Sequence, residues 1–132
     1  MNKKEYARAN KEWLAQKATD EGVLPLVKGV YYKVLASGDA TGKSPMTRSV
    51  IMVHYTGWTI DGKQFDSSRG SVPLAIRLNE LIEGWIVALA QMRVGDRWEV
   101  YIPAEMGYGN FSQPGIPGGS TLIYDIELIG IA

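Results

Sequence analysis

Apolar and polar residues alternate along much of the chain after residue 30, which is the pattern of β-strands. Stretches rich in β-branched and aromatic residues, which favour strands, cover residues 30–35, 50–58, 96–104 and 120–131. The pair Asp61-Gly62, typical of a hairpin turn, separates residues 50–58 from a short partner strand at 64–66. The pattern therefore predicts a chain dominated by one sheet.

The last of these stretches indicates how the sheet is exposed. One of its faces carries only apolar side chains, those of Leu122, Tyr124, Ile126 and Leu128. Asp125 and Glu127 lie on the opposite face. A strand with one apolar and one wet face is typical of an antiparallel sheet.

Residues 2–21 interrupt the strand pattern and predict a helix. They lack Gly and Pro and are rich in good helix formers, Asn2 and Glu5 match a capping box, and Gly22 occupies the place of a helix C-cap. The apolar stripe of this helix is narrow and consists of Tyr6, Ala9 and Trp13, with Leu14 beside it. We expect the helix to dock lightly, either on its own domain or as the remnant of an oligomerising arm.

A second, shorter helix is predicted around Trp85. Ile82, Trp85, Ile86 and Leu89 have the i, i+3, i+4, i+7 spacing of about two amphipathic turns, and Gly95 follows as a stop signal. A long loop over 105–119, rich in Gly and Pro, comes later, and ordered loops of that length are often functional. The elements predict an α+β architecture, a mostly antiparallel sheet with one helix against it and an additional N-terminal helix.

Composition then limits the possible functions. The chain has 132 residues, 45% of them hydrophobic and 21% charged, which is the length and composition of one globular domain. Its formal net charge is zero, so it lacks the basic excess of a typical nucleic-acid-binding domain. It contains no cysteine and no apolar run long enough for a membrane span. We expect no nucleic-acid or membrane partner and a cytoplasmic location, or a periplasmic or exported one if a leader was removed.

The residues that most catalytic sites require are missing. The single histidine, His54, lies in a predicted strand without signs of the partners that a triad or metal site needs. Gly42-Lys43-Ser44 lacks the upstream glycine of a phosphate-binding loop. We therefore predict neither a metal nor a cofactor. The unusual feature is aromatic, four Trp and seven Tyr against two Phe, which indicates a concave surface built from aromatic side chains.

An ordered set of motifs resembles a known enzyme family. The set consists of Val53-His54-Tyr55-Thr56-Gly57, Asp61-Gly62-Lys63-Gln64-Phe65-Asp66-Ser67-Ser68-Arg69, Glu83-Gly84-Trp85, Gln91-Met92-Arg93-Val94-Gly95-Asp96, Pro103-Ala104-Glu105-Met106-Gly107-Tyr108-Gly109, Pro114-Gly115-Ile116-Pro117 and Thr121-Leu122-Ile123-Tyr124-Asp125-Ile126-Glu127-Leu128. From about residue 29 onward, it is similar to the FK-binding-protein (FKBP) type of peptidyl-prolyl cis-trans isomerase. The resemblance implies a twisted antiparallel β-sheet wrapped on the short amphipathic helix.

The region upstream resembles bacterial members of the macrophage infectivity potentiator class. In those members an N-terminal arm precedes the catalytic domain, and helices in it form dimers. We accordingly interpret residues 1–22 as an N-terminal helix, a linker or arm remnant, and residues 23–132 as the isomerase domain. Because only about twenty helical residues precede the domain, we expect a monomer.

The resemblance also implies the residues of a pocket. Trp85 would form the floor under a proline ring, and the Tyr108 hydroxyl and the backbone N–H of Ile82 would bind substrate carbonyl groups. The residues implied as catalytic are Tyr55, Phe65, Asp66, Ile82, Trp85, Tyr108 and Tyr124. Those implied to contact substrate or a macrolide are Leu74, Leu81 and Ile116. Asp66 is expected to orient neighbouring hydroxyl groups or an arginine, with Arg69 as the candidate.

Three positions depart from the commonest pattern of the family. Tyr124 and Leu74 stand where phenylalanine is frequent, and Gln113 stands where some members have histidine, in a loop that is one residue shorter. We expect these departures to affect substrate preference and macrolide affinity more than activity.

The resulting hypothesis is an isomerase that acts on proline-containing unfolded or folding polypeptides and binds macrolides such as rapamycin. Rotation about a prolyl bond breaks no covalent bond, which agrees with the lack of a nucleophile, metal or proton relay. The alternative is a macrolide- or peptide-binding chaperone module with little turnover. A third reading is an interaction protein whose working part is the N-terminal helix.

Overall fold

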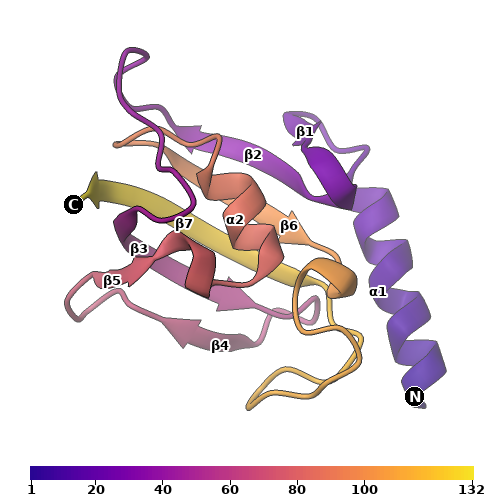
Figure 1. The fold of residues 1–132 in the computed structure, drawn as a ribbon. Coiled ribbons are helices and arrows are strands. Elements are labelled where there is room, and N and C mark those ends of the chain that lie inside the picture. Colours follow the sequence, from indigo (N-terminus) through magenta and orange to yellow (C-terminus); the bar gives the residue numbers. More distant parts are fainter.

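A twisted antiparallel sheet forms the frame of the protein and curves around a short helix, α2 (Figure 1). The computed structural model describes all 132 residues. Its helices and strands are α1 (Lys3–Lys17), β1 (Val23–Pro25), β2 (Tyr31–Ala36), β3 (Val50–Trp58), β4 (Gln64–Ser67), β5 (Leu74–Arg77), α2 (Glu83–Leu89), β6 (Arg97–Ile102) and β7 (Leu122–Ile131). Three single-turn helices, η1 (Val27–Gly29), η2 (Leu78–Glu80) and η3 (Ala104–Met106), connect them.

The C-terminal strand β7 lies at the centre of the sheet. The strand order is β1-β2-β6-β7-β3-β4, and β5 also pairs with β3. All of these pairs are antiparallel. β3 and β7 pair over most of their lengths, from Ile51 opposite Ile131 to Trp58 opposite Ile123. This long central pairing joins the two halves of the chain in one layer.

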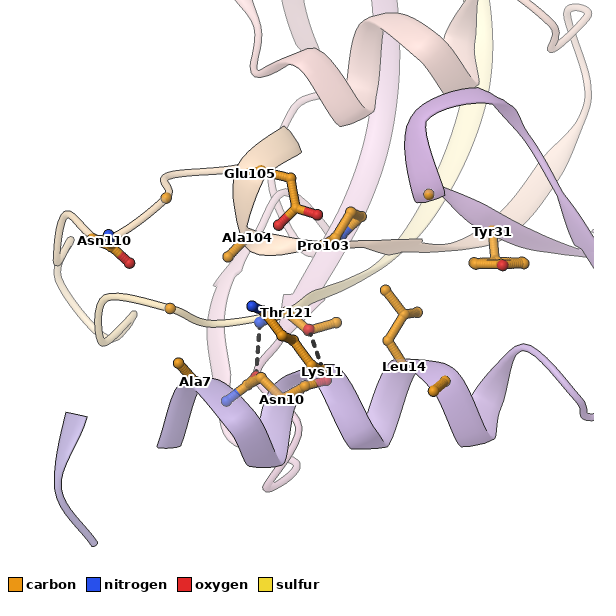
Figure 2. Close-up of a pocket in the computed structure, with 14 residues that line it drawn as sticks. Ala7, Asn10, Lys11, Leu14, Tyr31, Pro103, Ala104, Glu105, Asn110 and Thr121 are labelled. Carbon is orange, nitrogen blue, oxygen red and sulfur yellow. Dashed lines mark hydrogen bonds between the residues drawn. The ribbon is translucent and has the colours of Figure 1, made fainter. Parts of the chain in front are cut away.

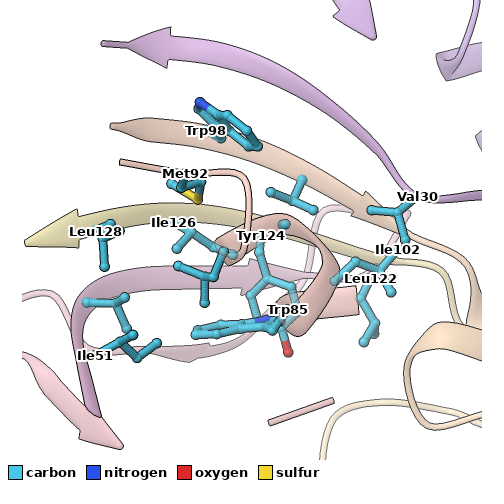
Figure 3. Close-up of a cluster of buried hydrophobic side chains, with 14 of the residues drawn as sticks. Val30, Ile51, Trp85, Met92, Trp98, Ile102, Leu122, Tyr124, Ile126 and Leu128 are labelled. Carbon is cyan, nitrogen blue, oxygen red and sulfur yellow. The ribbon is translucent and has the colours of Figure 1, made fainter. Parts of the chain in front are cut away.

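The hydrophobic core fills the space between the sheet and α2 (Figure 3). From β7, the predicted apolar face (Leu122, Tyr124, Ile126 and Leu128) points into it, and every one of these side chains is buried. From α2, Trp85, Ala88 and Leu89 are buried against the sheet. Full burial of a large apolar side chain contributes about 1.5–3 kcal/mol, so this contact holds the short helix in place.

The predicted strands are confirmed, and the structure contains two further short strands, β1 and β5, that were not predicted. The five predicted stretches correspond to β2, β3, β4, β6 and β7. β1 has only three residues and ends in Pro25, and β5 has four residues directly after Pro73. Such short strands carry little pattern of their own, and pairing with β2 and β3 determines them.

The polar face of β7 is less wet than its sequence suggests. Asp125 is only 8% exposed, although the prediction placed it on a face that meets water. Arg97 covers its carboxylate with a two-pronged ion pair, in which Nε and Nη2 lie 2.9 and 2.7 Å from the two oxygens. The sequence pattern shows which face a residue occupies, and the arginine on the adjacent strand decides whether water reaches it.

Helix α1 begins as predicted and ends earlier. The Asn2 side chain accepts a hydrogen bond from the Glu5 N–H at 2.8 Å, and the Glu5 carboxylate accepts one from the Asn2 N–H, so the capping box is confirmed. The prediction that Gly22 caps the C-terminus is wrong, because the helix ends at Lys17. The Thr19 hydroxyl donates to the Gln16 carbonyl at 2.7 Å, and such side-chain bonds compete with the helical ones.

Helix α1 packs on its own domain, which was the first of the two alternatives predicted for it. Its buried residues are Asn10 and Leu14, so the inner face includes a polar residue that the apolar stripe did not indicate. The Asn10 side chain accepts a hydrogen bond from the Thr121 N–H at 2.7 Å (Figure 2). It also donates one to the Tyr6 carbonyl at 2.8 Å. The docking of α1 thus depends on a buried polar residue, Asn10.

Neither α1 nor α2 combines the length and the apolar character that crossing a membrane requires.

Replacing Asn10 tests this anchor. Asn10→Ala removes the acceptor of the Thr121 N–H, which is buried with Thr121 at 2% exposure. We expect the free energy of unfolding to fall by about 2–3 kcal/mol, because a buried donor loses its only partner. Urea titration measures this change. The exposed neighbour Lys11 supplies the control, Lys11→Ala, and equal losses in the two variants would contradict the anchor.

Candidate active site

A pocket of about 250 Å³ opens at the N-terminal end of α2. It is lined by Tyr55, Asp66, Leu74, Glu80, Leu81, Ile82, Trp85, Tyr108 and Tyr124. These residues come from β3, β4, β5, η2, the start of α2, the loop after η3 and β7. Segments far apart in the sequence therefore meet here, and eight of the ten predicted site residues are among the nine.

Trp85 forms the floor of the pocket. It lies in the first turn of α2 and is 3% exposed. The edges of two tyrosine rings meet it, those of Tyr55 and Tyr124, each with ring centres 5.1 Å away and near-perpendicular planes. Figure 3 shows the indole of Trp85 beside the phenol of Tyr124. Such edge-to-face pairs add about 0.5–1.5 kcal/mol to the burial of the rings, which makes the floor rigid.

Phe65 supports the wall of the pocket from behind. Its ring meets Tyr124 edge to face at 5.5 Å but does not line the cavity. Both rings lie over Gly57 of β3, where a Cβ atom would come within 2.6–2.7 Å of Phe65 and Tyr124. A side chain at position 57 would therefore force the two rings away from their present positions.

The polar part of the pocket is a tyrosine–aspartate pair. The Tyr55 hydroxyl donates to Asp66 Oδ2 at 2.6 Å, and Asp66 Oδ1 accepts the N–H of Ser67 at 2.9 Å. Asp66 thus orients a hydroxyl group, as expected. Arg69 does not contact it; the guanidinium binds Glu127 at 2.9 Å on the other face of the sheet, so the expectation for Arg69 is wrong.

The phenols of the pocket are held in their neutral form. Burial raises the pKa of Tyr55, Tyr108 and Tyr124 above the ordinary value for tyrosine, and the carboxylate of Asp66 adds to the rise in each case. The Trp85 N–H, directed toward the Tyr124 phenol, offsets a small part of the rise there without completing a hydrogen bond. At neutral pH, these phenols are hydrogen-bond donors and not nucleophiles.

Two N–H groups at the pocket have no acceptor in the protein. The indole N–H of Trp85 is the one buried side-chain polar atom without a hydrogen-bond partner. The backbone N–H of Ile82, which precedes α2, also donates to no protein acceptor. Buried polar groups are almost always paired, so the unpaired indole N–H marks a place where the protein keeps hydrogen-bonding capacity free. Ile82 is only partly buried and precedes α2, where backbone N–H groups lack intrahelical acceptors.

The remaining predicted residues are distributed as follows. Leu74, Leu81 and Ile82 line the pocket as expected. Ile116 does not; it is 5% exposed, belongs to the core, and touches a different cavity. Glu80, which lines the pocket, was missed, because an exposed glutamate in a single-turn helix carries no sequence signal.

A larger cavity, of about 500 Å³, lies between α1 and the loop that follows β6 (Figure 2). Its lining contains one aromatic ring, that of Tyr31, and mostly small or polar side chains. It lacks the facing aromatic rings and the paired phenol and carboxylate of the smaller pocket. The candidate active site is therefore identified by its chemistry rather than its size.

Comparisons with known proteins find matches in one enzyme family. The family model for FKBP-type peptidyl-prolyl cis-trans isomerase matches residues 42–129. The FKBP-type isomerase FkpA of Escherichia coli is 38% identical over 92% of this chain and 44% of its own length. The outer membrane protein MIP of Legionella longbeachae is 37% identical over 90% of this chain and 51% of its own. The chain thus spans about half the length of the curated relatives it matches.

A solved structure supports the fold over its whole extent. The peptidyl-prolyl cis-trans isomerase of Pseudomonas syringae superimposes with a TM-score of 0.91 at 31% identity, covering 100% of this chain and 97% of that one. The predicted fold class and the family resemblance seen in the motifs are both confirmed.

The unpartnered hydroxyl of Tyr124 yields a stability prediction. Tyr124→Phe removes a group that makes no hydrogen bond in the protein, so we expect the free energy of unfolding to stay constant or rise by up to about 1 kcal/mol. Tyr101→Phe is the matched variant, because the buried Tyr101 hydroxyl donates to Glu99 at 2.6 Å. Urea titration should show a loss of about 1–2 kcal/mol there; an equal loss in both variants would mean that Tyr124 has a partner.

The raised pKa values predict alkaline destabilisation. In the folded protein, Tyr55 and Tyr124 retain protons that the unfolded chain releases near the ordinary tyrosine pKa of about 10. Their contribution to the free energy of unfolding is therefore fully present below that pH and is lost as the pH rises above it. We expect the free energy of unfolding to fall less steeply between about pH 9 and about pH 11 in Tyr55→Phe than in the wild type. Urea titrations across that range measure the slope, and equal slopes would refute the prediction.

Proposed function

We propose that this chain, which belongs to the family of FKBP-type peptidyl-prolyl cis-trans isomerases, catalyses rotation about peptide bonds that precede proline in folding polypeptides. The observation that carries the proposal is the aromatic pocket on Trp85, with neutral phenols and a free backbone N–H at its edge. Proline-containing unfolded or folding chains are the proposed substrates.

The chemistry of the pocket suits this reaction. A barrier of about 18–20 kcal/mol from amide resonance opposes rotation, and uncatalysed prolyl isomerisation takes tens of seconds or longer. The planar amide is strongly dipolar and well hydrated, whereas the twisted transition state has lost resonance and its carbonyl is less polar. An apolar pocket therefore disfavours the ground state relative to the transition state. Each tenfold acceleration needs only about 1.4 kcal/mol of this difference.

Each pocket group then has a role. The proline ring lies on Trp85, between the walls formed by Tyr55 and Tyr124. The Tyr108 hydroxyl and the Ile82 N–H donate to carbonyl groups on either side of the rotating bond. Asp66 holds the Tyr55 ring through the 2.6 Å hydrogen bond and transfers no proton, because the reaction moves none.

We also propose that the pocket binds macrolides such as rapamycin, with altered affinity. Leu74 lines the pocket and offers a smaller wall than phenylalanine would. Tyr124 adds a polar group to an otherwise apolar wall. Gln113 lies outside the pocket, in a tight turn closed by its hydrogen bonds to Ile116, so its effect on affinity is indirect.

The competing function is a peptide- or macrolide-binding chaperone module with little turnover. Its pocket would bind the same ligands, so only rate measurements separate the two. The proposal of turnover is supported by the complete set of donors and aromatic walls at the pocket.

The chain is proposed to act as a monomer. The inner face of α1 packs on its own domain through Asn10 and Leu14, which leaves little apolar helix surface for a second copy. For the compartment, the cytoplasm remains the first proposal and export the alternative; the name of the Legionella relative, an outer membrane protein, supports the alternative.

A protease-free assay of cis-to-trans conversion in short prolyl peptides tests the proposal. We expect the wild type to accelerate conversion and rapamycin to abolish the acceleration. The double variant Tyr108→Phe, Asp66→Ala should lose at least about tenfold in kcat/KM, because it removes a carbonyl donor and frees the Tyr55 ring. Tyr32→Phe, a phenol that stacks on Trp98 away from the pocket, is the control.

The possible outcomes separate the hypotheses. Rapamycin binding without acceleration would establish the chaperone module instead. Full activity of the double variant would show that the reaction takes place elsewhere than in this pocket.

A further inference from the structure

The loop that carries Tyr108 is closed at its base by a single backbone pair. The chain leaves the sheet after β6, passes Tyr108, and returns to β7, and the Gly119 N–H donates to the Gly109 carbonyl at 2.8 Å where the two limbs meet. Gly109 directly follows Tyr108, and its own N–H donates to the Ala104 carbonyl at 2.8 Å. The position of Tyr108 therefore depends on where residues 119–121 are held.

Helix α1 holds those residues from the outside. The Tyr6 hydroxyl shares a hydrogen bond of 2.8 Å with Ser120 Oγ, which also donates to the Pro117 carbonyl at 2.6 Å. Asn10 accepts the Thr121 N–H at 2.7 Å, and the Asn10 carbonyl accepts the Thr121 hydroxyl at 3.2 Å (Figure 2). Tyr6 and Asn10, one helical turn apart, thus hydrogen-bond two consecutive residues of the returning limb.

The helix also approaches the closing pair itself. Gly119 has φ +84°, a conformation that favours glycine, and a Cβ atom there would come within 3.2 Å of the Ala7 Cβ. Ala7 lies between Tyr6 and Asn10 on the same face of α1. The closing pair therefore packs directly under the helix.

The hydrogen bonds between α1 and the returning limb are buried, and cavities lie on either side of them. Asn10, Ser120 and Thr121 are 1–3% exposed, so water cannot replace their bonds. On either side, cavities of about 500 and 640 Å³ separate α1 from the rest of the loop, including Asn110. The hydrogen bonds at Ser120 and Thr121 and the contact of Ala7 with Gly119 therefore join α1 to the returning limb.

We propose that α1 is a positioning element of the active site, in which Tyr6 and Asn10 fix the returning limb of the loop and thereby the Tyr108 hydroxyl. Neither residue touches the pocket, so both act through Tyr108. The inference rests on the proposed isomerase function. It replaces the interpretation of residues 1–22 as a linker or arm remnant with that of a structural part of the catalytic unit.

A double-mutant cycle tests the link. Tyr6→Phe keeps the aromatic ring and removes only the hydroxyl bound to Ser120. We expect it to lower kcat/KM for a prolyl peptide about fivefold in the wild type, and less than twofold in a Tyr108→Phe background, because coupled residues are not additive. Tyr31→Phe is the control, since this phenol lines the cavity of about 500 Å³ beside α1 and makes no hydrogen bond to the loop; it should leave kcat/KM unchanged in both backgrounds.

General destabilisation would give a different result. If Tyr6→Phe acted only on stability, its effect on kcat/KM would be the same in both backgrounds, which would overturn the proposal. A wild type without isomerase activity would overturn the proposed function instead.

Amide hydrogen exchange supplies a readout that does not depend on catalysis. Tyr6→Phe should speed exchange of the Gly119 N–H by about fivefold while leaving amides in the middle of β7, such as Ile126, unchanged, because local opening costs less than global unfolding. Unchanged exchange at Gly119 would show that the hydroxyl does not hold the loop and would overturn the proposal independently of any rate.

Discussion

The contact between α2 and the sheet, centred on Trp85, is the constraint on which the site depends. A helix of seven residues is about 10 Å long, whereas a strand of ten residues such as β7 extends over about 33 Å. The helix therefore cannot cover the whole inner face of the sheet. Ala88 and Leu89 close the core at one end, and Trp85 at the other end meets the open pocket. The pocket is thus a geometric consequence of a short helix on a long, curved sheet.

The sheet also separates two electrostatic environments. Neighbouring residues of a strand point to opposite faces, so Tyr124 and Asp125 of β7 belong to different surroundings. Tyr124 faces the pocket, whose phenols remain neutral. Asp125 faces a network of ion pairs with Arg97 and Arg69 on the outer face. This separation explains why Arg69 is absent from the pocket: the carboxylates on the outer face attract it, and Asp66 is left to bind the Tyr55 hydroxyl.

The sequence predicted the elements in which apolar residues recur with a clear period, and it did not predict features that depend on contacts with distant residues. The long strands, α2 and pocket residues such as Tyr55, Trp85 and Tyr124 were predictable, because each of them lies in a periodic segment or in an ordered motif. The burial of Asn10 was not, since its side-chain and backbone oxygens accept hydrogen bonds from Thr121, more than a hundred residues away. The position of Ile116 was also missed, because a motif gives its place in the chain but not the direction of its side chain.

The cost of leaving hydrogen-bond donors unpaired bears on why this pocket exists. A buried donor without a partner costs about 1–3 kcal/mol, and the one buried side-chain donor in this condition is the Trp85 N–H. Since it points toward the Tyr124 phenol, the phenol oxygen faces a donor, which favours directing the Tyr124 proton away from the indole. The free Ile82 N–H lies at the entrance of the same pocket. A fold optimised for stability alone would satisfy the Trp85 N–H, and local rules are broken most often where a protein has a function. The unpaired indole N–H therefore marks the pocket as the place where binding, rather than folding, has determined the choice of residues.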